Sequence, residues 1–464
     1  MATTTGLAAV DHIVVLMLEN RSFDHMLGFL YTDAGNRSPA GDAFEGLSGS
    51  ESCPGSDGKP VPVYRLTPDT IYVYFYPGAD PGEGYAATND QCYGSKQPPA
   101  KGGVAPMQGF VTNYAQAIQD NLSRHWYVFP GTAEGWIMGC HTPQTLPVLS
   151  TLARGFCVCD HWYGSAPTMT LPNRAFLCAG TSQGQMDDKT KAYSVGTIFG
   201  ALTQAGVPWK IYGYEKPPLT KVEFPDTKSA PASNFGLFSD FTVDAQRGSL
   251  PAYAFLEPSW GSDGNSQHPN YNVALGEQLV LDTYRALRDG PAWDSTLLIV
   301  TYDEHGGCYD HVSPPWGATP PDSTPGEYGF DFTRFGPRVP AILAGGRVPA
   351  GTVHRVAEGA TPFDHTSVLA TIERRFGVKA LTKRDAAAPD LGGAITLSVP
   401  RTDDPLAGVN APTAPSNPTG LTVQPSHLQQ VQAALVAQQA GVPAQTLSAL
   451  RTNQEYGQFI GEHG

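Results

Sequence analysis

Residues 12–20 read HIVVLMLEN, and residues 295–304 read STLLIVTYDE. In both segments a short, continuous apolar run is followed at once by polar side chains. An apolar run without alternation is typical of a strand that is buried on both faces, as in a parallel sheet. Open parallel sheets bind ligands beyond the carboxyl ends of their strands. The two segments therefore predict two buried strands whose polar ends face a ligand site.

The surrounding sequence alternates similar strands with helices. Further strands are predicted at residues 209–214, 253–256 and 339–343. A helix is predicted to begin at Phe23 and to run to Leu30. Further helices are predicted at residues 107–119, 147–153, 195–204, 274–287 and 366–376. This alternation indicates an α/β fold with a mostly parallel sheet sandwiched by helices.

The composition excludes several classes of protein. The chain has 464 residues, of which 29 are Lys or Arg and 43 are Asp or Glu, which gives a net charge of −14. An acidic chain repels polyphosphate backbones, so we expect no nucleic-acid partner. Only 16 % of residues are charged, whereas 51 are Gly and 41 are Pro, which excludes a coiled coil and indicates long irregular segments on a smaller regular core.

The irregular segments concentrate in particular places. Residues 30–106 are rich in Gly, Pro, Asp and Tyr and predict a cap or rim insertion over the sheet. Within it, Tyr72-Val-Tyr-Phe-Tyr76 reads as an edge strand with rings packed on the core, or alternatively as an aromatic wall for an amphipathic substrate. Residues 314–325 predict a second loop near the active site.

The domain organisation follows from a change in composition near residue 404. Residues 1–403 are predicted to form the main domain and residues 404–422 a linker. Residues 423–464 are predicted to form a small helical appendage, with helices at 427–441 and 444–455.

The chain shows no run of 18 apolar residues, so no transmembrane helix is predicted. The N-terminus lacks a basic region, and Asp11 and His12 interrupt its apolar stretch, which argues against a signal peptide. We therefore expect a cytoplasmic protein, or a secreted one whose leader was removed. The seven cysteines are irregularly spaced and define no disulfide framework.

Oxygen-bearing side chains end the two quoted strands: Glu19, Asn20, Asp303 and Glu304. Carboxylate and amide oxygens are ligands for divalent cations, and adjacent carboxylates repel each other unless a cation or a base neutralises them. Each pair alone also fits a cap or a surface ion pair. The second pair continues into DEHGGCYDH, residues 303–311, where His305 and His311 could bind metal or transfer protons.

A third cluster is SAPTMTLPNR, residues 165–174. Pro172 suits the first turn of a helix, which places Thr170 at or beside the N-cap. There the free N–H groups and the helix dipole favour an anion, so the Thr170 hydroxyl could serve as a nucleophile toward a phosphoryl group. A simple Thr cap without catalysis is the alternative.

Together, Glu19-Asn-Arg-Ser-Phe-Asp-His25, Thr170-Leu-Pro-Asn-Arg174 and the segment 303–311 resemble the signatures of a phosphoesterase family. That family holds bacterial phospholipases C, plant non-specific phospholipases C and a bacterial acid phosphatase. The segment from Leu146 to Trp162 and the pair His268-Pro also look like this family. The resemblance covers roughly residues 8 to 400 and implies an alkaline-phosphatase-like core.

By motif position, the resemblance implies roles for individual residues. Thr170 would be the nucleophile, and His268 or His311 would protonate the leaving group. Glu19, Asn20, Asp303 and Glu304 would hold one divalent metal ion, whether Ca, Mg, Mn or Zn. Thr168 is a possible rival nucleophile, and the further site candidates are His141, Asp160, His161 and His365.

The expected reaction is hydrolysis of a phosphate ester through a phosphothreonine intermediate. A phospholipase C-type phosphodiesterase is the preferred reading, which implies a phospholipid substrate and at most transient contact with a membrane surface. A phosphomonoesterase of the acid phosphatase type is the alternative. A non-catalytic binding module with a structural metal is a third reading, and it predicts that the nucleophile or the acid is missing. The oligomeric state has no signal in the sequence.

Overall fold

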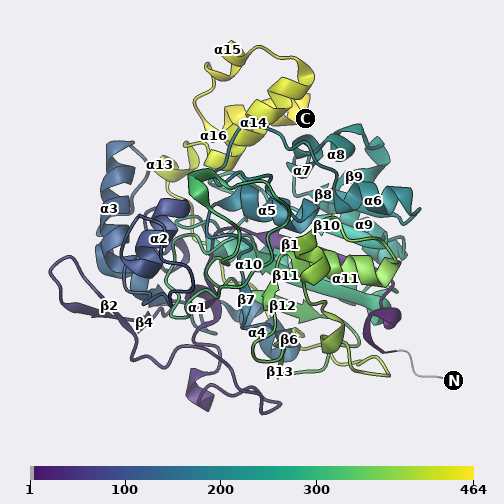
Figure 1. Cartoon of the computed structure of the whole chain (residues 1–464), viewed down its shortest axis with the longest axis horizontal. Helices are drawn as coiled ribbons and strands as arrows, with labels where there is room; N and C mark the ends of the chain where they lie inside the picture. The colour runs from purple at the N-terminus through teal and green to yellow at the C-terminus, as the bar shows by residue number, and fades with distance from the viewer. Residues whose placement is uncertain (1–4) are drawn as a thin grey trace.

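The two quoted segments form neighbouring strands at the centre of one sheet in the computed structural model, which describes residues 5–464 (Figure 1). Strand β1 (His12–Leu18) pairs in parallel with β11 (Thr296–Tyr302), in register from His12 opposite Thr296 to Leu18 opposite Tyr302. Ile13–Leu18 are fully buried, as continuous apolar strands in a parallel sheet should be. This pairing brings Glu19 and Asp303 to the same edge of the sheet.

The sheet has eight strands in the order β13-β6-β12-β11-β1-β10-β8-β9. Strands β11, β1, β10, β8 and β9 run parallel, whereas β12 is antiparallel to β11 and to β6. The bounds of the remaining strands are Cys157–Val158 (β6), Trp209–Gly213 (β8), Phe235–Leu237 (β9), Tyr253–Leu256 (β10), Ala341–Ala344 (β12) and Thr352–Val353 (β13). A mostly parallel sheet is thus confirmed.

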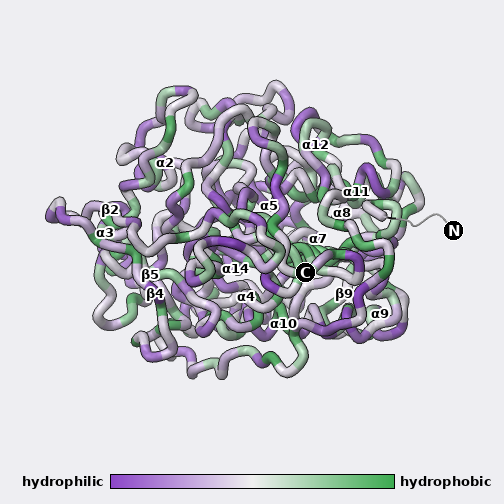
Figure 2. Tube along the Cα trace, turned by 90° about the horizontal axis from the view of Figure 1, so that it is seen from below, coloured by the Kyte–Doolittle hydropathy of each residue, from purple (hydrophilic) through white to green (hydrophobic). Residues whose placement is uncertain are grey.

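Helices cover both faces of this sheet. One layer consists of α4 (Pro147–Gly155), α9 (Phe238–Arg247) and α10 (Val273–Arg288), and the other of α5 (Thr170–Ala179), α6 (Ile198–Gln204) and α11 (Thr366–Phe376). Figure 2 shows α4, α9 and α10 on one side of the molecule and α5 and α11 on the other. The predicted α/β class, with a sheet sandwiched by helices, is confirmed. Helix α1 (Phe23–Leu27) ends earlier than expected, and α3 covers Phe110–Ser123.

Smaller elements complete the core. The short helices are α7 (Thr220–Glu223), α8 (Pro225–Ser229) and α12 (Lys383–Ala387), and the short strands are β5 (Gly139–Cys140), β7 (Trp162–Tyr163) and β14 (Phe363–Asp364). The 3-10 helices outside the cap are Gly6–Ala9, Glu134–Met138, Ala232–Asn234, Trp293–Ser295, Glu327–Gly329 and Gly392–Ala394. All seven cysteines are buried and unbonded.

Residues 30–106 lie beside the sheet together with α3, on the left in Figure 1. They contain the strands β2 (Ser52–Pro54), β3 (Pro60–Pro62) and β4 (Tyr64–Arg65), a 3-10 helix at Thr32–Ala34 and the nine-residue helix α2 (Tyr85–Tyr93). Although the composition predicts irregular structure here, α2 supplies a regular element that packs on α3.

The predicted edge strand at residues 72–76 is wrong. Val73–Phe75 form a 3-10 helix, and Tyr72 has a φ of 55°, outside the extended region. Successive turn hydrogen bonds, Val73 N–H to Thr70 O and Phe75 N–H to Tyr72 O, replace the ladder of a strand. The packing part of the prediction holds, because Phe75 and Tyr76 are buried.

The C-terminal region forms α13 (Thr419–Thr422), α14 (His427–Ala440), α15 (Ala444–Leu447) and α16 (Asn453–His463), drawn in yellow in Figure 1. The predicted helix at 444–455 is wrong: it is two helices, because Thr452 and Glu455 form a capping box that starts α16. Helices α14 and α16 pack together and α14 packs on α7. Within residues 5–464, no helix is long and apolar enough to span a membrane.

The segment 404–422, predicted as a linker, lies along the main body. Leu406 is buried in the main core, and the Tyr284 hydroxyl donates a hydrogen bond to the Asp404 carboxylate over 2.7 Å. The Asn272 side chain donates to Pro415 O. These contacts tie the C-terminal helices to the sheet domain.

Candidate active site

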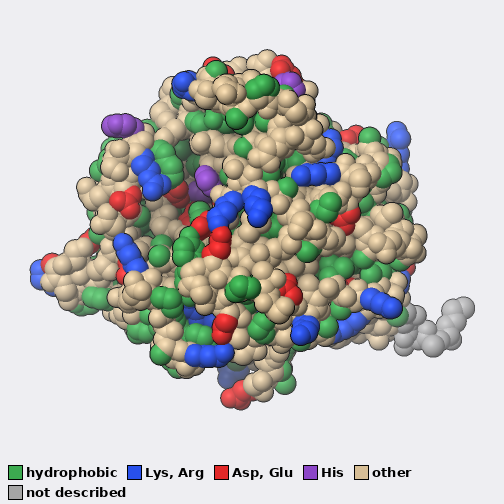
Figure 3. All heavy atoms as spheres, turned by 45° about the horizontal axis from the view of Figure 1, so that its top comes forward, with side chains coloured by type: hydrophobic (Ala, Val, Ile, Leu, Met, Phe, Trp, Pro, Cys, Tyr) green, Lys and Arg blue, Asp and Glu red, His purple; other side chains and the backbone are tan. Residues whose placement is uncertain are grey.

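A cavity of about 320 Å³ lies where β1 ends, and three parts of the chain enclose it. The sheet domain contributes Glu19, Thr170 and His268, and residues 80–84 of the cap form one wall. Residues 424–428, which precede α14 and begin its first turn, form another wall. Figure 3 shows a hollow on this face in which a histidine and acidic side chains are visible. None of the residues 314–325 lines this cavity.

Thr170 lies at the bottom of the cavity as the first residue of α5, after the N-cap Met169. The predicted helix start is therefore confirmed. The Thr170 hydroxyl donates a hydrogen bond to Asn20 Oδ1 over 3.0 Å, which fixes the direction of the Thr170 side chain. The positive end of the α5 dipole at this position favours a negatively charged group in the cavity.

Asn20 connects the ends of the two central strands. Its backbone N–H donates to Asp303 Oδ1 over 2.9 Å, and the N–H of Glu304 donates to the same oxygen over 2.8 Å. Together with the hydrogen bond from Thr170, these contacts join three of the sequence motifs through one amide and one carboxylate. The motifs are far apart in the chain, and the parallel pairing of β1 and β11 brings them together.

The glycine pair after Glu304 is required by this close approach. Gly306 has a φ of 63°, and a Cβ at this position would lie 1.8 Å from Asn20 O. No larger residue fits there without moving Asn20. The conformation lets the Gly306 N–H donate to Glu304 Oε2 over 2.7 Å, which holds the Glu304 side chain in place.

The carboxylates of this region are buried with little compensating charge. Burial raises the pKa of Glu19 to about 7, and burial also raises the pKa values of Asp303 and Glu304. Arg174 lies 3.2 Å from Asp303 and is the basic group in direct contact with it among the described residues. Glu19 Oε2 and Glu304 Oε1 are buried and have no hydrogen-bond partner within residues 5–464. Such a donor set is energetically costly unless a cation neutralises it.

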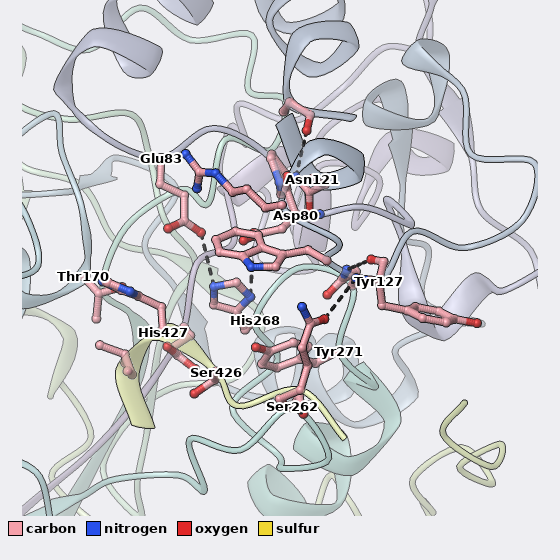
Figure 4. Close-up of a pocket in the computed structure, with 18 of the residues that line it drawn as sticks. Asp80, Glu83, Asn121, Tyr127, Thr170, Ser262, His268, Tyr271, Ser426 and His427 are labelled. Atoms are coloured by element: carbon pink, nitrogen blue, oxygen red, sulfur yellow. Dashed lines mark hydrogen bonds and ion pairs between the residues drawn. The ribbon is translucent and has the colours of Figure 1, made fainter. Parts of the chain in front are cut away.

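His268 lies in the cavity between two carboxylates (Figure 4). Its Nε2 is 3.3 Å from Glu83 Oε1, and its Nδ1 is 4.0 Å from Asp80 Oδ1. Burial alone would lower the pKa of His268, but Asp80 and Glu83 outweigh burial and raise it to about 10. His268 therefore carries a proton near neutral pH. The catalytic role that the resemblance implies for His268 stays a prediction.

Glu83 also contacts the other end of the site. The Asn20 side-chain amide donates to Glu83 Oε1 over 2.6 Å. The Oδ1 atom of the same Asn20 side chain accepts a hydrogen bond from Thr170. A chain of contacts therefore runs from His268 through Glu83 and Asn20 to the Thr170 hydroxyl. Asp80, Glu83 and His268 form one of two described groups of three whose ligand atoms lie within 4.8 Å of one another.

The second such group is Asp24, Asp310 and His311, and it does not line the cavity. His311 Nδ1 lies 2.6 Å from Asp24 Oδ2, and Arg338 bridges Asp24 and Asp310 at 2.8 and 3.0 Å. Burial lowers the pKa of His311, but Asp24 raises it by more, so the net shift is upward. The structure thus places His268, and not His311, in the cavity with Thr170, and a leaving-group role for His311 remains only a prediction.

Two of the other candidate histidines, His305 and His365, contact the segment that carries Asp303 and Glu304. The His365 ring lies 2.6 Å from the carbonyl oxygen of Asp303, and the His305 ring lies 2.7 Å from Gln91 Oε1 and 3.1 Å from Glu304 Oε2. Burial lowers the pKa of His305 to about 3 and that of His365 to about 4, so both rings are neutral. They orient the carboxylate segment without facing the cavity.

The remaining candidates make structural contacts elsewhere. His141 packs edge-on against His25, Asp160 pairs with Arg355, and His161 contacts Glu45. The Thr168 hydroxyl donates to Met186 O, so it is engaged with the backbone, whereas Thr170 faces the cavity.

The polar residues that line the cavity and that sequence reasoning missed include Asp80, Glu83, Asp188 and His427. Asp188 is buried and accepts from the N–H of Leu171 over 2.7 Å at the start of α5, and burial raises its pKa. His427 Nε2 lies 3.8 Å from Asp188 Oδ2. The sequence carries one local signal, since Ser426 and Gln429 form a capping box that places His427 in the first turn of α14.

A hydroxyl at a helix N-terminus, buried carboxylates at two strand ends and a histidine between carboxylates are groups suited to the hydrolysis of phosphoric esters. The family comparison agrees, because the model of the Phosphoesterase family matches residues 10–379 and the chain belongs to that family. The chain is therefore a hydrolase that acts on phosphoric ester bonds.

Relatives that are similar in sequence to this chain include plant and mycobacterial phospholipases C. Non-specific phospholipase C3 of Arabidopsis thaliana is 35 % identical over 432 residues, covering 87 % of this chain and 77 % of the relative. Non-specific phospholipase C6 of the same plant is 34 % identical over 419 residues, with 86 % and 74 % covered. Phospholipase C A of Mycobacterium tuberculosis is 31 % identical over 436 residues, with 85 % and 78 % covered.

Solved structures similar to parts of the fold include a protein in the alkaline phosphatase superfamily from Vibrio parahaemolyticus. It has a TM-score of 0.33 and 15 % identity and covers 55 % of this chain and 65 % of that one. The phosphonate monoester hydrolase from Silicibacter pomeroyi has a TM-score of 0.32 and 13 % identity, with 54 % and 72 % covered.

Proposed function

We propose that the chain is a metal-dependent phospholipase C-type phosphodiesterase with Thr170 as its nucleophile. The observation that carries the proposal is the Thr170 hydroxyl, which faces the cavity from the first residue of α5 and is aimed by Asn20. The names of the relatives support a phospholipase C, and the cavity offers room beyond a phosphate, beside Trp126, Tyr127 and Tyr271.

Glu19, Asn20, Asp303 and Glu304 would hold one divalent cation. The unpartnered Glu19 Oε2 and Glu304 Oε1 and the upward pKa shifts of these two residues fit a missing positive charge, and hard oxygen ligands suit Ca, Mg, Mn or Zn. When bound, the cation would supply Lewis-acid charge that favours ionised Thr170 and offsets the charge of the phosphoryl oxygens.

The residues of the chain would then act in two steps. In the first, Thr170 Oγ1 attacks phosphorus, the bond to the leaving alcohol breaks, and a phosphothreonine forms. The N-terminus of α5 stabilises the charge that spreads over the phosphoryl oxygens. In the second, water attacks the phosphothreonine, His268 takes the proton of the water, and the bond between phosphorus and Thr170 Oγ1 breaks, which releases the phosphorylated headgroup and regenerates ionised Thr170. Asn20 positions the Thr170 hydroxyl before the first step.

His268 would donate the proton to the leaving alcohol, because Asp80 and Glu83 keep it protonated in the cavity. His268→Gln is expected to lower kcat on a phosphatidylcholine by about 10²- to 10⁴-fold. The loss on p-nitrophenylphosphorylcholine should be much smaller, because p-nitrophenolate leaves without a proton. Steady-state kinetics on both substrates measures the difference, and an equal loss on the two would remove the acid role.

The choice between a phosphodiesterase and a phosphomonoesterase is tested by paired substrates. We expect kcat/KM for p-nitrophenylphosphorylcholine to exceed that for p-nitrophenyl phosphate. Both release the same chromophore, so the comparison isolates the second ester group. A strong preference for the monoester would favour an acid phosphatase, the alternative, and no turnover of either would favour a binding module.

For domain organisation, we propose that residues 1–403 form the catalytic domain and that residues 423–464 are an appendage that completes its cavity. The contacts of Ser426 and His427 with the cavity support this division of labour. The partner would be a phospholipid at a membrane surface, bound transiently during turnover.

A further inference from the structure

A second groove, of about 700 Å³, adjoins the catalytic cavity. The two share four lining residues, Gly82, Gly84, Ala117 and Asp120. The groove runs along α2 and α3 and reaches Tyr328. A ligand held at Thr170 can therefore extend into the groove across the glycines of the cap without leaving the protein surface.

Small and aromatic side chains form the surface of the groove. Ala86, Ala87, Ala117 and Pro98 leave it open, and Tyr85 and Tyr328 stack with their rings 5.9 Å apart and 9° from parallel. Tyr328 is 58 % exposed, so part of its ring is open to a ligand in the groove. Its hydroxyl donates to Asp187 over 2.5 Å, which fixes the ring as a wall.

Some of the polar side chains along the groove have hydrogen-bond partners within the protein. Gln116 donates to Asp120 over 2.9 Å. Asn113 accepts from Gln91 and donates to Asp90, both over 2.9 Å. Lys96, Gln97 and Asp187 also line the groove, and beside them a ligand meets the side chains of the alanines, Pro98 and the two tyrosines, in contrast to the acidic catalytic cavity.

We propose that this groove binds an acyl chain of the lipid on the leaving side of the scissile bond. The proposal rests on the proposed phospholipase C function and deepens it. An acyl chain fits because it is apolar, flexible and covalently tied to the group at Thr170, so continuity with the catalytic cavity is required. Each methylene buried is worth about 0.8 kcal/mol, which corresponds to up to about fourfold in binding.

The test is a chain-length series of short-chain phosphatidylcholines, assayed as monomers below their micelle-forming concentration. For the unaltered protein, kcat/KM should rise up to about fourfold per added methylene until the groove is filled. Ala86→Trp, at an exposed position on α2, should fill the groove and flatten this rise. Ala205→Trp, exposed at the end of α6 and outside both cavities, is the matched control and should keep it.

Tyr328→Ser is the second variant, because it removes the wall of the groove without adding bulk. It should also reduce the dependence on chain length. Both variants should retain turnover of p-nitrophenylphosphorylcholine, which has no acyl chain. A chain-length dependence unchanged in both variants would overturn the groove assignment. If the unaltered protein fails to cleave any phosphodiester, the proposed function fails, which is a different result.

Discussion

Replacing Thr170 by alanine is expected to lower kcat on p-nitrophenylphosphorylcholine by at least about 10⁴-fold, since loss of a nucleophile removes the covalent route altogether. The folded state should survive, because the substitution deletes one hydrogen bond, to Asn20, worth roughly 1 kcal/mol. The melting temperature and kcat should be measured on the same preparation.

Two controls sharpen this prediction. Thr170→Ser keeps a hydroxyl at the start of α5 and should retain measurable turnover. Thr168→Ala removes the neighbouring hydroxyl, whose partner is Met186 O, and should leave far more activity than Thr170→Ala. Near-normal hydrolysis by Thr170→Ala would eliminate the nucleophile assignment, and a loss confined to Thr168→Ala would transfer it.

Removal of divalent metal is the second change with a large expected effect. Exhaustive chelation should reduce kcat by about 10³-fold or more and should also lower the melting temperature. The stability loss follows from linkage, because an ion at 1,000 times its dissociation constant stabilises the folded state by about 4.1 kcal/mol. Without the ion, its positive charge no longer offsets the unpartnered carboxylate oxygens at the ends of β1 and β11, and the folded state is less stable.

Reactivation identifies the ion. Ca, Mg, Mn and Zn should be added back separately to the chelated protein, with metal content measured alongside activity. Glu304→Gln is the matched variant, since it removes the charge of one proposed ligand and keeps its size, and it should weaken reactivation. Full activity in a preparation without detectable metal would require a mechanism without the ion.

The sequence predicts the centre of this fold well and its periphery poorly. Continuous apolar runs next to polar residues locate β1 and β11, because burial on both faces leaves little choice of side chain. The aromatic run at residues 72–76 predicts a strand but forms a 3-10 helix, because aromatic residues favour strands only when a neighbouring strand is available. The sequence of residues 72–76 does not reveal whether a partner strand lies beside them.

The same distinction applies to the site. Thr170 and the strand-end carboxylates lie in motifs with a defined place in a helix or strand, so their approach follows from topology. Asp80, Glu83 and His427 come from the cap and from the C-terminal region, and their position next to His268 depends on how these parts dock. His311 shows the converse, because its motif suggested the cavity and its ring pairs with Asp24.

The wall formed by residues 424–428 sets an order on biosynthesis. Thr170, Glu19 and His268 leave the ribosome before this wall is made, so these three lining side chains are present in a nascent chain whose cavity is still open on one side. At about 5–20 residues per second, tens of seconds separate the synthesis of Thr170 from that of His427. The cavity therefore reaches its final form only after residues 424–428 have been made and have docked beside the sheet domain.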